Sequence, residues 1–134
     1  MILIVCIDKK NGMMFNKRRQ SQDRVVREKI LEHAAGGKLW MSSYSAKQFT
    51  EGGEFIEDED CVTKAGEGEY CFVEDKDFSL ENCEQVILYH WNRQYPGDRF
   101  FKEDLKANGY RKISETEFAG YSHEKITEQI FVKK

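Results

Sequence analysis

The chain has very little proline and no long apolar run. Pro96 is its only proline, and no internal repeat, low-complexity tract or linker is visible, so stiff proline-rich spacers and repeat architectures are excluded. No apolar run approaches the roughly 20 residues that a membrane helix needs, and the opening MILIVCI is too short and wrongly flanked for a signal peptide. We therefore expect a cytoplasmic protein.

The chain also lacks paired cysteines and clustered histidines. Its four cysteines show no CxxC spacing and lie in segments typical of strand or helix, so we expect free, buried thiols. His33, His90 and His123 form neither an HxH nor an HExxH motif, so no zinc-hydrolase signal is present and we expect no metal site. A Ser/His/Asp or Cys/His/Asn set cannot be proposed from spacing, because such groups meet only in the fold.

Chain length and charge distribution limit the number of domains and the classes of ligand. The 134 residues, 40% of them apolar, predict one domain over 1–134 with a core of its own. Residues 51–84 hold thirteen acids against two lysines, a balance that would repel a phosphate backbone, so extended nucleic-acid binding is disfavoured. Residues 16–29 instead hold six basic and two acidic side chains, and this segment could hold a small anion.

Strand and helix patterns alternate over most of the chain. ILIVCI (2–7) is a continuous apolar run, typical of a strand buried on both faces. A helix is predicted from about 22 to 35, with Ser21 as its cap and the Gly-Gly pair at its end. Further strands are predicted at 38–42, 70–74 and 85–91, with short helical segments between them. Such alternation favours a parallel sheet.

The last part of the chain changes character. YRKISETEFA (110–119) and KITEQIFVK (125–133) are partly alternating strands, and the loop GYSHE between them is short enough for an antiparallel hairpin. The sequence therefore predicts an α/β fold with a mostly parallel, mixed sheet that ends in this hairpin.

The order of elements, with ILIVCIDKKNGMMFN at the start and YPGDRFF before the hairpin, resembles dihydrofolate reductase along nearly the whole chain. GKLWMSSYSAKQF is similar to that family's second strand and its Met-Gly-Arg-x-Thr-x-x-Ser motif. The resemblance implies a three-layer fold, shortened in the middle, where only TEGG follows KQF. Short bacterial chains similar to this one are sometimes labelled ribonuclease Z, but that enzyme class uses a His-x-His-x-Asp-His motif that is absent here.

The motifs that touch the cofactor depart from the family pattern. Ser42 and Ser43 replace the Gly-Arg pair that approaches the NADPH phosphates, and only Ser45 stands where a phosphate-contacting threonine would be. Glu74 and Asp75 replace a Gly-Gly pair whose amides face the pyrophosphate. A carboxylate close to a diphosphate is repelled by on the order of 1 kcal/mol per pair even in a high dielectric. We expect no cofactor, with Ser45 as the single cofactor-side candidate.

Carried over by position, Asp23 falls on the family's pterin-binding carboxylate, Ile4 on the strand that meets the pterin, and Tyr89 on the hydroxyl that hydrogen-bonds the acid. Proton donation to a substrate ring requires an acid whose pKa is raised by an apolar pocket. Asp23 and Arg27, however, have the spacing of a favourable i,i+4 pair that keeps the carboxylate ionised. Three interpretations stay open: a helix-opening acid, a ligand contact, or a catalytic proton donor.

Arg18, Arg24 and Arg27 stand where the family has a tryptophan or apolar pocket residues. They form either a solvated face or a lining of guanidinium groups, which would suit a carboxylate or phosphate ligand because arginine offers a planar fork of donors. The predicted ligand-binding site comprises these three residues with Ile4, Asp23 and Tyr89.

The sequence thus predicts a dihydrofolate-reductase-like protein that has lost NADPH-dependent reduction and binds a small anionic molecule or a protein partner in the remaining cleft. The alternative is a functional oxidoreductase that uses its cofactor in an atypical way. A further alternative is an RNA-processing protein.

Overall fold

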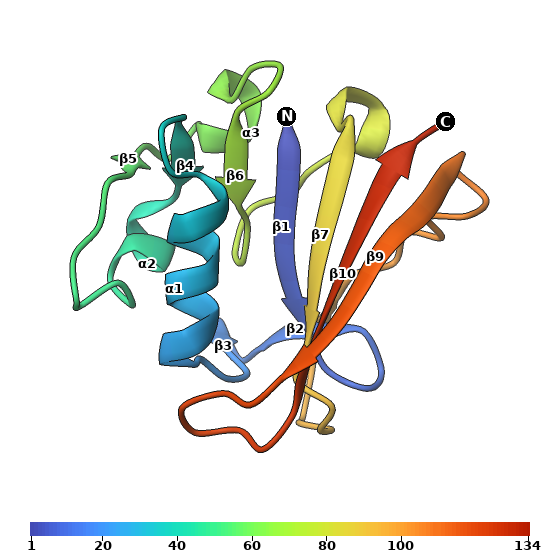
Figure 1. Ribbon diagram of the computed structural model, residues 1–134. Helices are drawn as coiled ribbons and strands as arrows, with labels where there is room; N and C mark the ends of the chain where they lie inside the picture. Colours follow the sequence, from blue (N-terminus) through green and yellow to red (C-terminus); the bar gives the residue numbers. More distant parts are fainter.

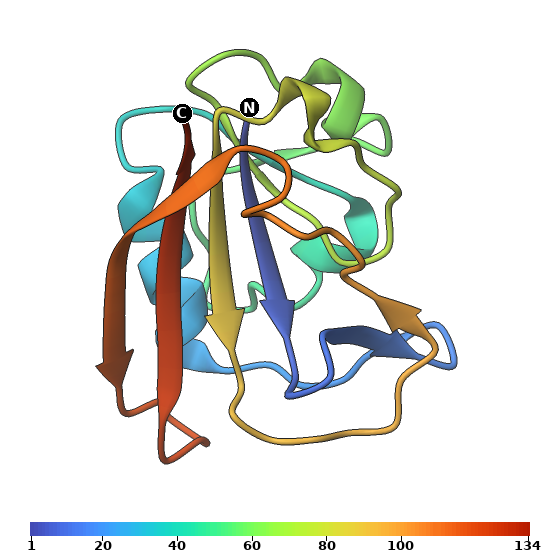
Figure 2. The same cartoon turned by 90° about the vertical axis from the view of Figure 1, so that its right-hand side faces the viewer.

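A computed structural model describes all of residues 1–134, which build a central seven-stranded sheet in the order β5-β4-β6-β1-β7-β10-β9 (Figures 1 and 2). The strands are β1 (Ile2–Ile7), β4 (Leu39–Met41), β5 (Ile56–Glu57), β6 (Tyr70–Phe72), β7 (Gln85–His90), β9 (Tyr110–Phe118) and β10 (Ile126–Lys133). The first five in the sheet order are parallel, whereas β10 pairs antiparallel with both β7 and β9. The predicted mixed sheet with a C-terminal hairpin is confirmed.

Strand β1 is central because both of its faces are apolar. Leu3 and Val5 point into one core cluster, whereas Ile2 and Ile4 point into the other. Successive side chains of a strand alternate between the two faces of a sheet, so a continuous apolar run can be buried only where both faces are covered. The apolar run 2–7 predicted a strand buried on both faces, and β1, at the middle of the sheet, is that strand.

Helices and irregular segments cover the two faces. Helix α1 (Arg24–His33) contributes Val26 and Ile30 to the cluster of Ile2 and Ile4. The opposite face is covered by α3 (Cys61–Lys64), the 3-10 turn η1 (Leu80–Asn82) and the chain around Phe101. The remaining helix, α2 (Ser43–Ala46), follows β4 at the carboxyl ends of the parallel strands. Figure 1 shows α1 and α2 on the same side of the sheet.

A second, small sheet was not predicted. It joins β3 (Arg18–Arg19), β2 (Gly12–Phe15) and β8 (Arg99–Phe100) in the order β3-β2-β8. Asn16 and Lys17 connect β2 to β3 with φ values of 54° and 63°, both in the left-handed region. Two such residues in a two-residue hairpin loop are typical of a type I′ turn.

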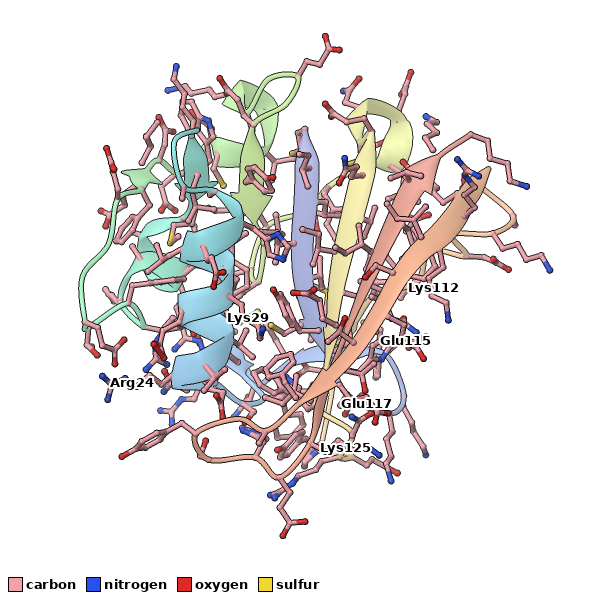
Figure 3. The ribbon with its side chains drawn as sticks, viewed as in Figure 1. Arg24, Lys29, Lys112, Glu115, Glu117 and Lys125 are labelled. Carbon is pink, nitrogen blue, oxygen red and sulfur yellow. The ribbon has the colours of Figure 1, made fainter.

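Strand β9 is the long outer edge of the large sheet. Its exposed side chains are mostly charged, and Figure 3 shows Lys112, Glu115 and Glu117 along the hairpin. Lys112 and Lys125 pair with Glu115 and Glu117, with N–O distances of 2.8 and 3.2 Å. Charges on an edge strand oppose pairing with another chain, so this edge is protected against sheet extension.

All four cysteines are free thiols; Cys61, Cys71 and Cys83 are buried and Cys6 is half-buried. Because of burial, the pKa of the Cys6 thiol lies above its usual range. No group of three or more His, Cys, Asp or Glu side chains is arranged to hold a metal ion. None of the helices combines the length and the apolar character that crossing a bilayer requires.

Candidate functional site

Helix α1 begins directly after Asp23. The Asp23 backbone is extended, and its side chain accepts a hydrogen bond from the Val25 amide at 2.8 Å. This is an N-cap, since a short side-chain oxygen satisfies one of the amides that the first helical turn leaves free. The prediction that Ser21 caps the helix is wrong, because the helix starts at Arg24 and its cap is the residue just before it.

The loop between β9 and β10 closes over the Asp23 carboxylate. The amides of Tyr121 and Ser122 donate to it at 3.0 and 2.9 Å, and the Ser122 hydroxyl donates at 3.2 Å. The Nδ1 atom of His123 lies 2.8 Å from the same carboxylate. Asp23 is only 2% exposed, so these protein groups, not water, surround it.

The hydrogen bonds decide the charge of Asp23. Burial by itself would raise the pKa of this carboxyl, but the donors from Ser122, Tyr121, His123 and Val25 hold it below its ordinary value of 3.8. A carboxyl that is to protonate a substrate near neutral pH needs the opposite shift. The geometry therefore favours an ionised, structurally engaged Asp23.

His123 links this carboxylate to a serine. Its Nε2 atom lies 2.8 Å from the Ser21 hydroxyl, and its ring stacks on Trp91 with a centroid distance of 4.7 Å and an interplanar angle of 25°. Ser21 and Asp23 lie at the start of α1, whereas His123 is 100 residues from Asp23 in the β9–β10 loop. Sequence reasoning missed this arrangement because only the fold brings the loop to the helix.

Tyr89 does not contact Asp23, contrary to the prediction. Its hydroxyl donates to Glu128 at 2.7 Å, and Glu128 also lies 2.9 Å from the Nε2 atom of His33. The His33 contact lowers the pKa of Glu128, whereas burial and this carboxylate raise the pKa of Tyr89 well above its usual range. Through Glu128, Tyr89 on β7 is therefore linked by hydrogen bonds to His33 at the end of α1.

The predicted pair of Asp23 with Arg27 is also wrong. Arg27 is turned toward the segment after α2, where it donates two hydrogen bonds of 2.9 Å to the carboxylate of Glu51. This contact lowers the pKa of Glu51 to about 2. Arg18 and Arg24 are exposed, and Figure 3 shows Arg24 at the outer side of α1. The three arginines therefore do not line one surface together.

Aromatic side chains fill the space between α1 and the carboxyl ends of β4 and β6. Phe49 packs on Phe55 and Phe72 with centroid distances of 5.5 and 6.0 Å, in the same core cluster as Ile4. Ile4 is completely buried there. The six residues predicted to bind a ligand are thus divided between the core, the Asp23 network and the outer surface, and the fold does not gather them around one opening.

The carboxyl ends of β4 and β6 carry a buried ionic network. Glu74 accepts two hydrogen bonds from the Arg19 guanidinium, at 3.0 and 3.2 Å, and one of 2.8 Å from the Ser45 hydroxyl. The guanidinium also lies over the Tyr44 ring, 4.3 Å from its centroid, and donates to the Tyr44 carbonyl at 3.0 Å. Ser45, the predicted cofactor contact, is therefore occupied by a carboxylate of the protein.

The neighbouring acid behaves in the same way. Asp75 accepts a hydrogen bond of 2.7 Å from the hydroxyl of Ser42, which is also the N-cap residue of α2. Both Glu74 and Asp75 thus turn inward to the start of α2, not away into solvent. The hydroxyl groups of Ser42 and Ser45 could donate hydrogen bonds to an external anion, but both already donate to carboxylates of the protein.

An open cavity of about 490 Å³ lies beside this network. It is lined by Met14, Asn16, Lys17, Tyr44, Asp75, Asp98 and Arg99. Asp98 accepts from the Asn16 amide at 3.0 Å, and Arg99 donates to the Lys76 carbonyl and to Asp77. Among the charged lining groups, Lys17 alone has no hydrogen bond or ion pair through its side chain.

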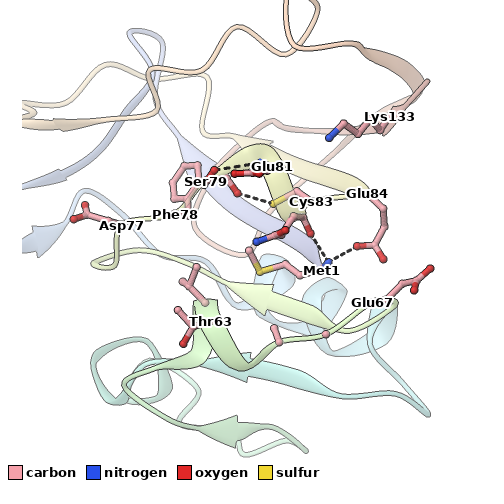
Figure 4. A pocket seen from close by; sticks show the side chains of 14 residues that line it. Met1, Thr63, Glu67, Asp77, Phe78, Ser79, Glu81, Cys83, Glu84 and Lys133 are labelled. Carbon is pink, nitrogen blue, oxygen red and sulfur yellow. Dashed lines mark hydrogen bonds and ion pairs between the residues drawn. The ribbon is translucent and has the colours of Figure 1, made fainter.

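Figure 4 shows another cavity, of about 850 Å³, at the amino ends of β1 and β7. Its labelled rim carries Glu67, Asp77, Glu81 and Glu84 against Lys133. Four acids around one lysine disfavour an anionic ligand. In open parallel sheets ligands bind outside the carboxyl ends of the strands, which is the end where the 490 Å³ cavity lies.

Comparison with known proteins bears on the fold. The chain matches no protein-family model and no curated protein sequence. Among solved structures it is similar to dihydrofolate reductase from Enterococcus faecalis in complex with NADP(H) and RAB-propyl, with a TM-score of 0.65 over 99% of this chain and 95% of that one. The chain has the dihydrofolate reductase fold. Its sequence identity to that enzyme is 9%, so the likeness extends to the fold alone.

Proposed function

We propose that this chain is a dihydrofolate-reductase-like protein that does not carry out NADPH-dependent reduction and instead binds a small anionic molecule. The observation that carries the first part is the Glu74 carboxylate, 7% exposed at the end of β6. The resemblance puts the pyrophosphate against bare amides at this position. Glu74 is paired with Arg19, so a diphosphate at this position would have to break that ion pair and would then face a carboxylate in a region of low dielectric.

The surrounding donors support the same proposal. Arg19 and Ser45 both donate to Glu74. Without that carboxylate, their guanidinium and hydroxyl groups could bind a phosphate group. Ser42 donates to Asp75. A nucleotide would have to displace these carboxylates and leave them without partners, which costs more than the new contacts return. These residues do not fit a dinucleotide phosphate.

The state of Asp23 supports the loss of reduction independently. Five protein donors surround its carboxylate, and its lowered pKa favours the ionised form. The resemblance puts the pterin beside Ile4 and assigns its carboxylate partner to Asp23. The chain therefore has no evident donor for a proton at that position.

We place the anionic ligand in the 490 Å³ cavity, not in the site predicted from the sequence. The ammonium group of Lys17 is the one charged lining group without a partner, and Tyr44 and Met14 supply apolar surface. Asp75 and Asp98 also line this cavity, and each already accepts a hydrogen bond from the protein. The unpaired ammonium group beside Tyr44 and Met14 suits a small carboxylate or phosphate, since the anion is then paired while its organic part is covered.

The first part is tested by titrating the protein with NADPH while recording cofactor fluorescence and the thermal midpoint. We expect no change in either, and no loss of NADPH absorbance when dihydrofolate is added. A bound cofactor in large excess would raise the midpoint by mass action. A raised midpoint together with hydride transfer to dihydrofolate would establish an oxidoreductase with atypical cofactor use and overturn the proposal.

The second part is tested with inorganic phosphate and citrate as probes, added at constant ionic strength. We expect either probe to raise the thermal midpoint of the wild type but not that of K17A. The matched control K106A removes an exposed lysine outside this cavity and should respond like the wild type. Equal responses of K17A and the wild type would exclude this cavity as the anion site.

A further inference from the structure

Three side chains at the start of α1 and in the β9–β10 loop form one continuous hydrogen-bonded chain. The Ser21 hydroxyl lies 2.8 Å from Nε2 of His123, and Nδ1 of His123 lies 2.8 Å from the Asp23 carboxylate. The Tyr95 hydroxyl also lies 3.5 Å from Nε2, and the Ser122 hydroxyl lies 3.2 Å from Nδ1, but Ser21 and Asp23 are the nearer partner of each nitrogen. From this connectivity we infer that Ser21, His123 and Asp23 form a nucleophilic triad that acts on carboxylic esters.

The proton positions follow from the partners. Asp23 is ionised and can only accept, so the hydrogen of the neutral His123 ring lies on Nδ1. The Nε2 atom is then an acceptor, and the Ser21 hydroxyl donates to it. A serine whose proton points at an unprotonated imidazole nitrogen is the arrangement that general-base activation requires.

The histidine is held rigidly in this orientation. Its ring stacks on Trp91, and the side chain is only 4% exposed. The amides of Tyr121 and Ser122 hold Asp23 at the same time, so neither the base nor the group that orients it can turn away. A fixed base contributes more than a mobile one because no reorganisation is needed when the proton moves.

The three residues differ in their exposure to solvent. Asp23 and His123 are buried, whereas Ser21 is partly exposed, so Ser21 is the residue of the three that lies nearest the surface. The amides of Arg24 and Val26 in the first turn of α1 have no acceptor in the protein. The dipole of this ten-residue helix is positive at this end, and the ionised Asp23 side chain at its N-cap offsets that potential.

The reaction balances with water as the second substrate. Ser21 Oγ forms a bond to the ester carbonyl carbon while its proton passes to Nε2 of His123. The bond from that carbon to the alcohol oxygen breaks, and the histidine returns the proton to the leaving alkoxide. Water then adds to the acyl-serine with the same proton transfers and releases the acid. Asp23 is a positioning residue that stays ionised throughout.

The same hydrogen bonds also hold the β9–β10 loop against α1. If that were their only role, Ser21 would not be a reactive nucleophile. We would treat the folded wild type with a fluorophosphonate probe, in which the serine oxygen bonds to phosphorus and fluoride leaves, and identify the labelled peptide by mass spectrometry. We expect the label on Ser21. A serine that only holds a loop does not react with this probe.

Hydrolysis of 4-nitrophenyl acetate supplies the second readout. We expect S21A and H123Q to lower the protein-dependent rate by about a hundredfold, the order that a positioned base contributes. The control S114A removes a hydroxyl with no hydrogen bond on β9 and should keep the wild-type rate.

Folding is checked separately by circular dichroism and the thermal midpoint of each variant. Absence of label on Ser21 in the folded wild type would overturn the inference. It would also fall if folded S21A hydrolysed the ester as fast as the wild type, or if S21A lowered only the thermal midpoint.

Discussion

The guanidinium of Arg19 and the carboxylate of Glu74 form a two-bonded ion pair that joins the small sheet to the end of β6. The side chains are 17% and 8% exposed, so both charges are largely removed from water. A pair of this kind is costly to break because the remaining partner keeps its charge without compensation.

We expect R19A to lower the free energy of unfolding by about 2–3 kcal/mol, somewhat less than for a fully buried pair because Arg19 keeps some contact with water. Urea denaturation would measure the change. The control K112A removes an exposed pair with Glu115 and should cost less than about 1 kcal/mol. If R19A were no more costly than K112A, the pair would contribute little to stability.

The turn between β2 and β3 supplies another test, because Lys17 has a φ of 63°. A lysine is strained in this region, whereas glycine adopts it freely. We expect K17G to raise the free energy of unfolding by about 0.5–1 kcal/mol while removing the response to phosphate and citrate. The variant K17N, which tolerates the same backbone but also lacks the charge, should likewise lose the response. A destabilised K17G would contradict the turn geometry.

Some strands could be predicted from the sequence and others could not. The apolar run of β1 and the alternating hairpin β9–β10 were predictable, because their patterns differ from those of helices and loops. The small sheet was not, since Arg18–Arg19 and Arg99–Phe100 are two-residue strands rich in charge. Their pairing with β2 depends on the tertiary structure and not on local propensity.

The site shows the same limit. Asp23 could be identified as a helix-opening acid, because that role depends on its immediate neighbours. Its contacts with His123 and Ser122 could not, because they join residues about 100 positions apart. The i,i+4 rule likewise favoured Asp23 as the partner of Arg27, but the bidentate geometry offered by Glu51 in the fold is the contact that forms. The one available pointer was a histidine in a short hairpin loop.

Acid should destabilise the protein through Asp23. Its pKa in the folded state lies below the ordinary 3.8, so its contribution to stability is complete above about pH 4 and is lost as the pH falls toward the folded-state pKa. We expect the free energy of unfolding to decrease below pH 4, and to decrease less in D23N. The control E67Q changes an exposed carboxylate that has no hydrogen bond. A D23N variant with the wild-type pH dependence would contradict this assignment.

Gly120 tests how closely the β9–β10 loop approaches Asp23. A Cβ atom at this position would lie 2.5 Å from the Oδ2 atom of Asp23 and 2.7 Å from Cδ1 of Ile126. Neither neighbour can retreat, since Asp23 is held by the loop amides and Ile126 is completely buried. We expect G120A to lower the free energy of unfolding by about 1–3 kcal/mol, the usual cost of overpacking.

The matched control for this substitution is G66A, because a Cβ atom there would meet its nearest neighbour only at 3.6 Å. Chemical denaturation of both variants would compare the costs. If the loop bonds to Asp23 are as close as described, G120A should also weaken the contact between Asp23 and His123, and with it the reactivity of Ser21. A G120A variant as stable as G66A would show that the loop can move away from the helix at little cost, and a base carried on such a loop could not be held in position for the serine.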